Sequence, residues 1–161
     1  MRYSSNNIRN AMKPLLAALV IALLLPAGQT NAADAAALPE VTLSINKHAL
    51  TAEVAANDNT RTTGLMHRRM MPENRGMLFV FTDEANHAMW MKNTFIPLSV
   101  AFIDSKGVIT NIEDMKPHTE DAHPATRPVR YALEMNLGWF AKRGIKAGAK
   151  IEGLEKAPAP K

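Results

Sequence analysis

The sequence predicts a mainly β fold, namely a β-sandwich or barrel that carries two short helices. Two observations carry this prediction. Apolar and polar residues alternate in several short segments, as they do in strands with one buried face. Turn residues separate these segments at hairpin-like intervals, and helical patterns occur in only two short stretches. An alternating α/β fold would need longer helices between its strands, so the pattern favours the sandwich or barrel.

The first predicted elements are two strands and a helix. Apolar residues alternate with polar ones over residues 41–45 and again over residues 50–54. Residues 57–60 offer several N-cap side chains, which predicts a short helix over residues 61–69. Because glycine is a poor helix former, Gly64 indicates that another part of the chain approaches closely there.

The middle of the chain predicts the central strands. Residues 76–81 are apolar without interruption, which is typical of a strand covered on both faces. A polar stretch at residues 82–84 resembles a turn, and residues 88–93 are a further strand candidate. Residues 98–103 and 108–112 are apolar and separated by a turn sequence, so they predict a hairpin.

The C-terminal part predicts a long loop, then a strand, a helix and a final strand. Three prolines with polar neighbours indicate a loop over residues 116–128. Residues 131–135 alternate as a strand does, and residues 137–143 predict a short helix that ends at Gly144. Residues 150–152 complete a set of about seven predicted strands.

The N-terminus has the layout of a cleavable signal peptide. Arg2, Arg9 and Lys13 precede an apolar run at residues 15–25, and small residues precede the expected cleavage site after Ala32. The run spans about 16 Å as a helix of about 1.5 Å per residue. A bilayer core is roughly 30 Å thick, so we expect no stable membrane anchor after cleavage. The sequence therefore predicts a periplasmic or secreted protein.

With cleavage after Ala32, the sequence predicts four regions in the chain. The signal peptide occupies residues 1–32, a flexible lead-in residues 33–39, one domain residues 40–154 and a flexible tail residues 155–161. The chain carries 19 basic and 15 acidic residues, and three of the basic ones belong to the signal peptide. The remainder lacks the excess of cations that nucleic-acid binding requires. The absence of cysteine excludes disulfides, thiol nucleophiles and cysteine metal sites.

Four motifs follow one another through the predicted domain. They read GLMHR at residues 64–68, GMLFVF at residues 76–81, WMKNT at residues 90–94 and YALEMN at residues 131–136. In this order and spacing the chain resembles the DUF192 family, also called UPF0127, over about residues 41–153. The resemblance implies a compact, jelly-roll-like β-sandwich with small helices, and it brings no established activity. One departure is Met89, because the family usually has an aromatic residue before the tryptophan.

Charged and aromatic residues near these motifs predict a polar pocket. Trp90 and Lys92 stand two apart, so they would share one face of a strand, and a buried lysine needs an acidic partner. Asp104 and Glu134 are the expected partners of Lys92 or Arg61. The predicted pocket consists of Arg61, Met66, Trp90, Lys92, Asn93, Asp104 and Glu134. The alternative, which the pattern favours slightly, is a structural ion-pair network with Trp90 in the core.

Two classes of function follow from such a pocket. The first, which leads, is a binding module of the cell envelope for an unknown small molecule or peptide, with Trp90 as the apolar wall. The second is a hydrolase-like envelope enzyme with Asp104 or Glu134 as the general base. No sequence motif indicates a cofactor.

The methionines introduce a third class of function, a copper-handling protein. Six methionines lie between residues 66 and 91, and His67 and His87 lie among them. Thioethers and imidazoles are soft ligands that suit copper. Flexible methionine side chains also fill irregular cores, and this interpretation is favoured. His118 and His123 match no known zinc spacing, so the sequence predicts no metal site.

Overall fold

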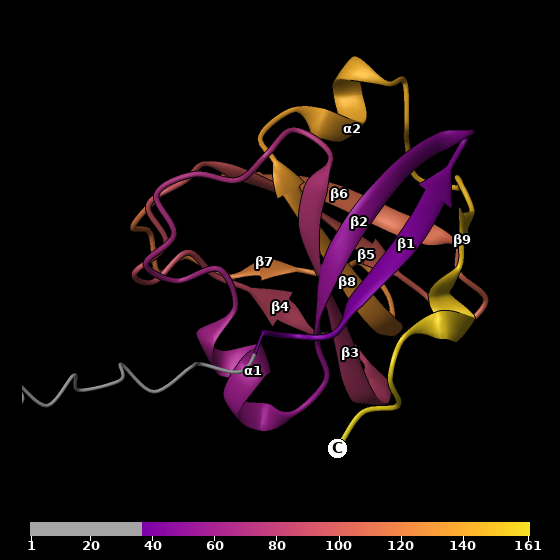
Figure 1. Cartoon of the computed structure of the whole chain (residues 1–161), viewed down its shortest axis with the longest axis horizontal. Coiled ribbons are helices and arrows are strands. Elements are labelled where there is room, and N and C mark those ends of the chain that lie inside the picture. Colours follow the sequence, from indigo (N-terminus) through magenta and orange to yellow (C-terminus); the bar gives the residue numbers. More distant parts are fainter. Residues whose placement is uncertain (1–36) are drawn as a thin grey trace, which may run out of the picture. The chain divides into compact units, whose positions relative to one another are not determined.

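The computed structural model describes residues 37–161, and the predicted signal peptide lies outside this part of the chain. Nine strands, two α-helices and one 3₁₀ helix occur in the described residues (Figure 1). In chain order these are β1 (Glu40–Ile45), β2 (His48–Ala55), α1 (Asp58–Thr63), β3 (Arg75–Ala85), β4 (Ala88–Met89), β5 (Leu98–Ile103), β6 (Ile109–Met115), β7 (His123–Pro124), β8 (Val129–Asn136), α2 (Trp139–Lys142), β9 (Ile151–Glu152) and η1 (Leu154–Lys156).

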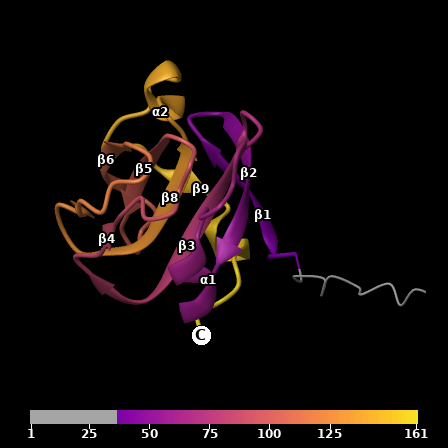
Figure 2. The same cartoon turned by 90° about the vertical axis from the view of Figure 1, so that its left-hand side faces the viewer.

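Seven strands form one curled sheet in the order β6-β5-β8-β3-β2-β1-β9, and β4 pairs with β7 in a small second sheet. Neighbouring strands are antiparallel except for the parallel pair of β2 and β3. A bridge between Val108 and Lys150 joins the two ends of this order. The sheet thus curls into a half-barrel, and its two edges meet at this bridge. The two short helices lie at opposite ends of it (Figure 1, Figure 2).

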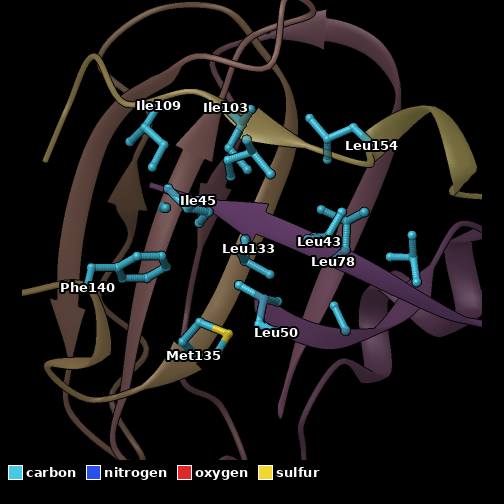
Figure 3. Packing of buried hydrophobic residues seen from close by; sticks show 14 of the residues in the cluster. Leu43, Ile45, Leu50, Leu78, Ile103, Ile109, Leu133, Met135, Phe140 and Leu154 are labelled. Atoms are coloured by element: carbon cyan, nitrogen blue, oxygen red, sulfur yellow. The ribbon is translucent and has the colours of Figure 1, made fainter. Parts of the chain in front are cut away.

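The prediction of a mainly β fold with two short helices is confirmed, but the sandwich is replaced by a single curled sheet. Leu43 and Ile45 of β1, Ile103 of β5, Ile109 of β6 and Leu133 of β8 belong to one buried cluster (Figure 3). Because β1 and β6 stand near opposite ends of the strand order, the sheet wraps around these side chains. Burial of each contributes about 1.5–3 kcal/mol, so the alternating apolar residues hold the curl.

The other face of the sheet carries a second apolar cluster. Met77 and Phe79 of β3 and Val100 of β5 lie on this face, and Met91 and Ile96 cover them from the segment between β4 and β5. Strand β3 is thus buried on both faces over the apolar run that predicted a doubly covered strand.

Two segments of the structure differ from the prediction. Residues 82–85 continue β3 instead of turning, and the pairing of β3 with β8 shifts register between Val80 and Ala85. A bulge of this kind bends a strand, and it allows polar residues to continue β3 beyond the core. The strand expected over residues 88–93 ends at Met89, so Trp90 and Lys92 lie in a segment of turns.

Gly64 ends the first helix earlier than the prediction of residues 61–69. Its backbone has a φ of 47°, which favours glycine. A Cβ at this position would lie 3.1 Å from Cζ of Phe79. The predicted close approach at Gly64 is confirmed, because the end of α1 packs against Phe79 of β3.

Asn57 caps α1 in the region where the sequence predicted a cap. Its Oδ1 accepts from the backbone N of Thr60 at 2.9 Å, and Oγ1 of Thr60 accepts from the backbone N of Asn57 at 3.1 Å. We expect Asn57→Ala to lower the free energy of unfolding by about 1 kcal/mol, because it leaves helix N–H groups without acceptors. Urea unfolding measures this loss. The neighbouring Asn59→Ala is the matched control, and an equal loss in both variants would contradict the capping role.

Candidate functional site

The seven predicted pocket residues do not converge on one cavity. Arg61 and Trp90 line one groove, and Met66 lines another. Asp104 belongs to the turn between β5 and β6, and Glu134 is buried in β8. The structure therefore brings together two of the predicted residues.

The groove shared by Arg61 and Trp90 lies between α1, the end of β3 and β4. It has a volume of about 290 Å³. We call it the Trp90 groove, and its lining residues are Asp58, Arg61, Thr62, Phe79, Phe81, Thr82, His87, Ala88, Met89 and Trp90. Small-molecule sites measure roughly 300–1,000 Å³, so this groove fits one aromatic ring or one peptide side chain.

Arg61 is the cation of the Trp90 groove, and its side chain is only 13 % exposed. Nη1 donates to the carbonyl of Val80 at 2.9 Å, and Nη2 donates to Oδ1 of Asp58 at 2.6 Å and to the carbonyl of Lys161 at 3.1 Å. A guanidinium has five N–H donors, so these three bonds leave two donors for a further acceptor. The expected pairing of Arg61 with Asp104 or Glu134 does not form.

Aromatic rings make up much of the groove wall. The imidazole of His87 stacks on Phe81 with the centroids 3.7 Å apart and the planes at 16°. Nε2 of His87 lies 3.3 Å from the carbonyl oxygen of Asp83. The bulged end of β3 and the turn to β4 bring these residues together. The sequence did not predict that Phe81 and His87 stack in this groove, because no local motif marks a contact that a bulge creates.

Trp90 is a rim residue of the groove and not a core residue. Its side chain is 43 % exposed, whereas Trp139 is 2 % exposed and is the tryptophan of the core. Nζ of Lys92 lies 5.2 Å from the centre of the Trp90 ring. The two residues are close, as the sequence predicted, but turns rather than a strand place them there. A cation at this distance from an indole is attracted by about 0.5–1 kcal/mol.

Met66 and Asn93 are two of the five predicted residues that do not line the Trp90 groove. Met66 lines a second groove of about 450 Å³ on the other side of α1. Asn93 is exposed and has a φ of 53°, and its carbonyl accepts from the backbone N of His67 at 2.9 Å. Asn93 therefore holds two loops together through its backbone.

Asp104 closes the turn of the hairpin that joins β5 to β6. Its Oδ1 accepts from the backbone N of Lys106 at 3.0 Å and of Val108 at 2.9 Å. Its Oδ2 lies 3.8 Å from Nη2 of Arg127. The expected partnership of Asp104 with Lys92 or Arg61 is therefore wrong, because Asp104 serves the turn instead.

Glu134 is buried between Met77 and Val100 in the strand pairing, and it is 3 % exposed. No hydrogen bond or ion pair of its carboxyl group occurs within the described part of the chain. Burial raises the pKa of Glu134 from its ordinary value of 4.5 to about 8. The carboxyl group is therefore protonated at pH 7. Glu134 is buried and uncharged, and Asp104 is occupied by the backbone N–H groups of its turn, so neither is placed to act as a general base and the hydrolase alternative gains no support.

Residues 37–161 hold no group of three or more histidine, aspartate or glutamate side chains arranged to bind a metal ion. Met77, Met89 and Met91 pack in the second apolar cluster. Met70 is different, because it is 80 % exposed. Three of the six methionines thus fill the core and Met71 packs against it, as the favoured interpretation expected.

The geometry can now be compared with known proteins. The sequence profile of the DUF192 family, described as uncharacterized ACR, matches residues 41–153. The chain belongs to the DUF192 family. No curated protein matches the chain. The membership places both the half-barrel and the Trp90 groove within a domain of unassigned activity.

Two solved structures are similar to this DUF192 chain. One, from Sinorhizobium meliloti 1021 and described as a candidate transcription regulator, is 37 % identical with a TM-score of 0.71 and covers 74 % of this chain and 97 % of its own. The other, a protein of unknown function from Novosphingobium aromaticivorans DSM 12444, is 30 % identical with a TM-score of 0.66 and covers 71 % and 86 %. Within residues 37–161 no helix is long and apolar enough to cross a bilayer.

Proposed function

We propose that this DUF192 domain is an exported binding module of the cell envelope that takes a small molecule or a peptide side chain in the Trp90 groove. The observation that carries the proposal is the pairing of a partly buried guanidinium with an exposed indole on one concave surface. Binding sites commonly combine an apolar wall with a few convergent polar donors.

The chemistry of the groove selects the ligand class. The stacked pair of Phe81 and His87 and the rim residue Trp90 favour a flat apolar body. The two unused N–H donors of Arg61 favour an anionic oxygen, and Lys92 adds a second positive charge at the rim. A small aromatic carboxylate, or an aromatic side chain next to a carboxylate in a peptide, meets both requirements.

The description of the Sinorhizobium meliloti structure as a transcription regulator concerns that protein. Beyond the predicted signal peptide, this chain has 16 basic residues against 15 acidic ones. DNA binding depends on clustered excess cations, so the charge balance supports a binding role for small ligands over one for DNA.

Tryptophan fluorescence tests the proposal, because the chain contains two tryptophans of opposite exposure. We expect N-acetylphenylalanine to change the emission of the native protein in a saturable way. The change should be lost in Trp90→Phe, which leaves only the buried Trp139. If Trp90→Phe shows the same saturable change, the ligand binds elsewhere. If the native protein shows no saturable change in emission, the proposed ligand class is wrong.

A further inference from the structure

Three loops meet at one end of the sheet, next to the Trp90 groove but outside its lining. They follow α1, β4 and β6, and they lie together at the left of Figure 1. The backbone N of His67 donates to the carbonyl of Asn93 at 2.9 Å, and the backbone N of His118 donates to the carbonyl of Thr94 at 3.2 Å. We call residues 66–71, 91–97 and 116–121 the loop tip.

The backbone of the loop tip is strained. His67, Asn93 and His118 have φ values of 66°, 53° and 62°, which side chains other than glycine rarely adopt. The other two left-handed residues of this kind in the described chain, Asn46 and Lys47, form the turn between β1 and β2. Strain that is concentrated away from hairpin turns is typical of functional surfaces.

Phe95 stands at the centre of the loop tip, and its side chain is 37 % exposed. The guanidinium carbon of Arg69 lies 5.5 Å from the centre of its ring. The rings of His67 and His118 lie 5.9 Å and 5.0 Å away, centre to centre. Among residues 37–161, no hydrogen bond or ion pair engages the side chains of Arg69, His67 or His118. Their N–H groups are therefore available to an anionic partner.

Two of the four large exposed apolar side chains of the described chain belong to this tip, namely Met70 and Phe95, and Leu137 adjoins it at Pro97. The four are Met70 at 80 %, Trp90 at 43 %, Phe95 at 37 % and Leu137 at 44 %. Leu137 is close, because its backbone N donates to the carbonyl of Pro97 at 3.1 Å. Only Trp90, at the start of the same loop, faces the groove described above.

Cations are interleaved with these apolar side chains. Arg69, Lys92 and Lys116 are exposed at the tip, and two exposed acids, Glu120 and Asp121, lie on the same loops. A protein interface normally has an apolar core from which lysine is depleted. Aromatic residues mixed with cations are instead typical of surfaces that enter the headgroup region of a bilayer.

We propose that the loop tip docks on a phospholipid surface that carries anionic headgroups. Arg69 and Lys116 lie at the headgroup phosphates, and Met70 and Phe95 enter the boundary between headgroups and acyl chains. This inference is separate from the Trp90 groove, and neither depends on the other.

Co-sedimentation with vesicles tests the docking surface. The purified protein is expected to sediment with vesicles of phosphatidylglycerol and phosphatidylcholine but not with vesicles of phosphatidylcholine alone, and rising salt should weaken binding. We expect Arg69→Gln to lower the partition coefficient about fivefold, since one cation near such a surface contributes about that factor. Met70→Ser should lower it severalfold, because the buried apolar area is lost.

The control variant is Arg127→Gln, because Arg127 contacts Asp104 at the turn between β5 and β6. This variant should bind as the native protein does. Met70 is exposed, so its replacement leaves folding intact, and thermal unfolding verifies this. The proposal is wrong if the mixed vesicles do not sediment the protein, if both vesicle types bind equally, or if Arg69→Gln and Met70→Ser leave binding unchanged. Saturable binding of inorganic phosphate by a protein that does not bind the vesicles would assign the tip to a soluble oxyanion instead.

Discussion

Glu134→Gln is expected to abolish a pH dependence of the native domain. In the native domain we expect the free energy of unfolding to fall by about 4 kcal/mol between about pH 5 and about pH 9. The folded chain keeps the Glu134 proton up to about pH 8, whereas the unfolded chain releases it near pH 4.5. Above pH 4.5 the unfolded state therefore binds fewer protons, and the free energy of unfolding decreases as pH rises. Beyond about pH 9 both states are ionised and this loss is complete.

Urea unfolding over a series of pH values measures this effect. The glutamine variant has no proton to lose, so it should show a flatter profile and exceed the native protein in stability at high pH. Glu113→Gln is the matched control, since Glu113 lies opposite Val100 on the same row of the sheet and is half-buried. A Glu134→Gln profile with the native slope would show that the carboxyl group is ionised in the fold.

Gly76→Ala is expected to lower the free energy of unfolding by about 3 kcal/mol. Gly76 pairs with Met135 in the ladder between β3 and β8. An added Cβ would lie 2.5 Å from the carbonyl oxygen of Glu134 and would also collide with the sulfur of Met135. The backbone oxygen is fixed by the sheet, so the strands themselves must separate to accommodate the methyl group.

Thermal or urea unfolding measures this loss against Gly148→Ala. Gly148 has a φ of 90° but open space around it, so its replacement should cost only about 1–2 kcal/mol for the backbone conformation. A Gly76→Ala variant no less stable than the Gly148→Ala variant would contradict the tight packing of β3 against β8.

Local patterns predicted most of the strands and the two helices, because each depends on neighbours in sequence. The alternation over residues 41–45 and the branched residues over 98–103 appear as β1 and β5 with the expected burial. The curl did not follow from these patterns. It depends on a parallel pairing of β2 with β3 and on the bridge between Val108 and Lys150, which join residues far apart in the chain.

The site was less predictable than the fold. Trp90 and Lys92 stand two apart in the sequence and lie close together as predicted, and Arg61 was also predicted as a residue of the same pocket as Trp90. Asp104 was misassigned because a carboxylate after a strand has the same sequence signature whether it closes a turn or faces a cavity. The motifs at residues 64–68 and 90–94 reach into the loop tip, but the cluster around Phe95 could not be predicted from them, since three separate loops supply its side chains.

Calorimetry can test one contact of the proposed site in the Trp90 groove, namely the contact between a ligand carboxylate and the Arg61 guanidinium. N-acetylphenylalanine and its amide share the same aromatic body, and the amide carries a neutral carboxamide in place of the carboxylate. The native protein should bind the acid about tenfold more tightly than the amide, in line with a charge-assisted hydrogen bond of about 1.5 kcal/mol or more.

Arg61→Gln should reduce that ratio to about one, while the Arg127→Gln control retains it. Thermal unfolding of both variants separates lost binding from lost folding, because Arg61 also bonds to Val80 and Asp58. Titration calorimetry of the acid and the amide against the native protein and the Arg61→Gln variant is thus the decisive measurement. A tenfold preference that disappears with Arg61 is the predicted result, and equal affinities in the native protein, or a preference that survives in Arg61→Gln, would contradict the proposed site.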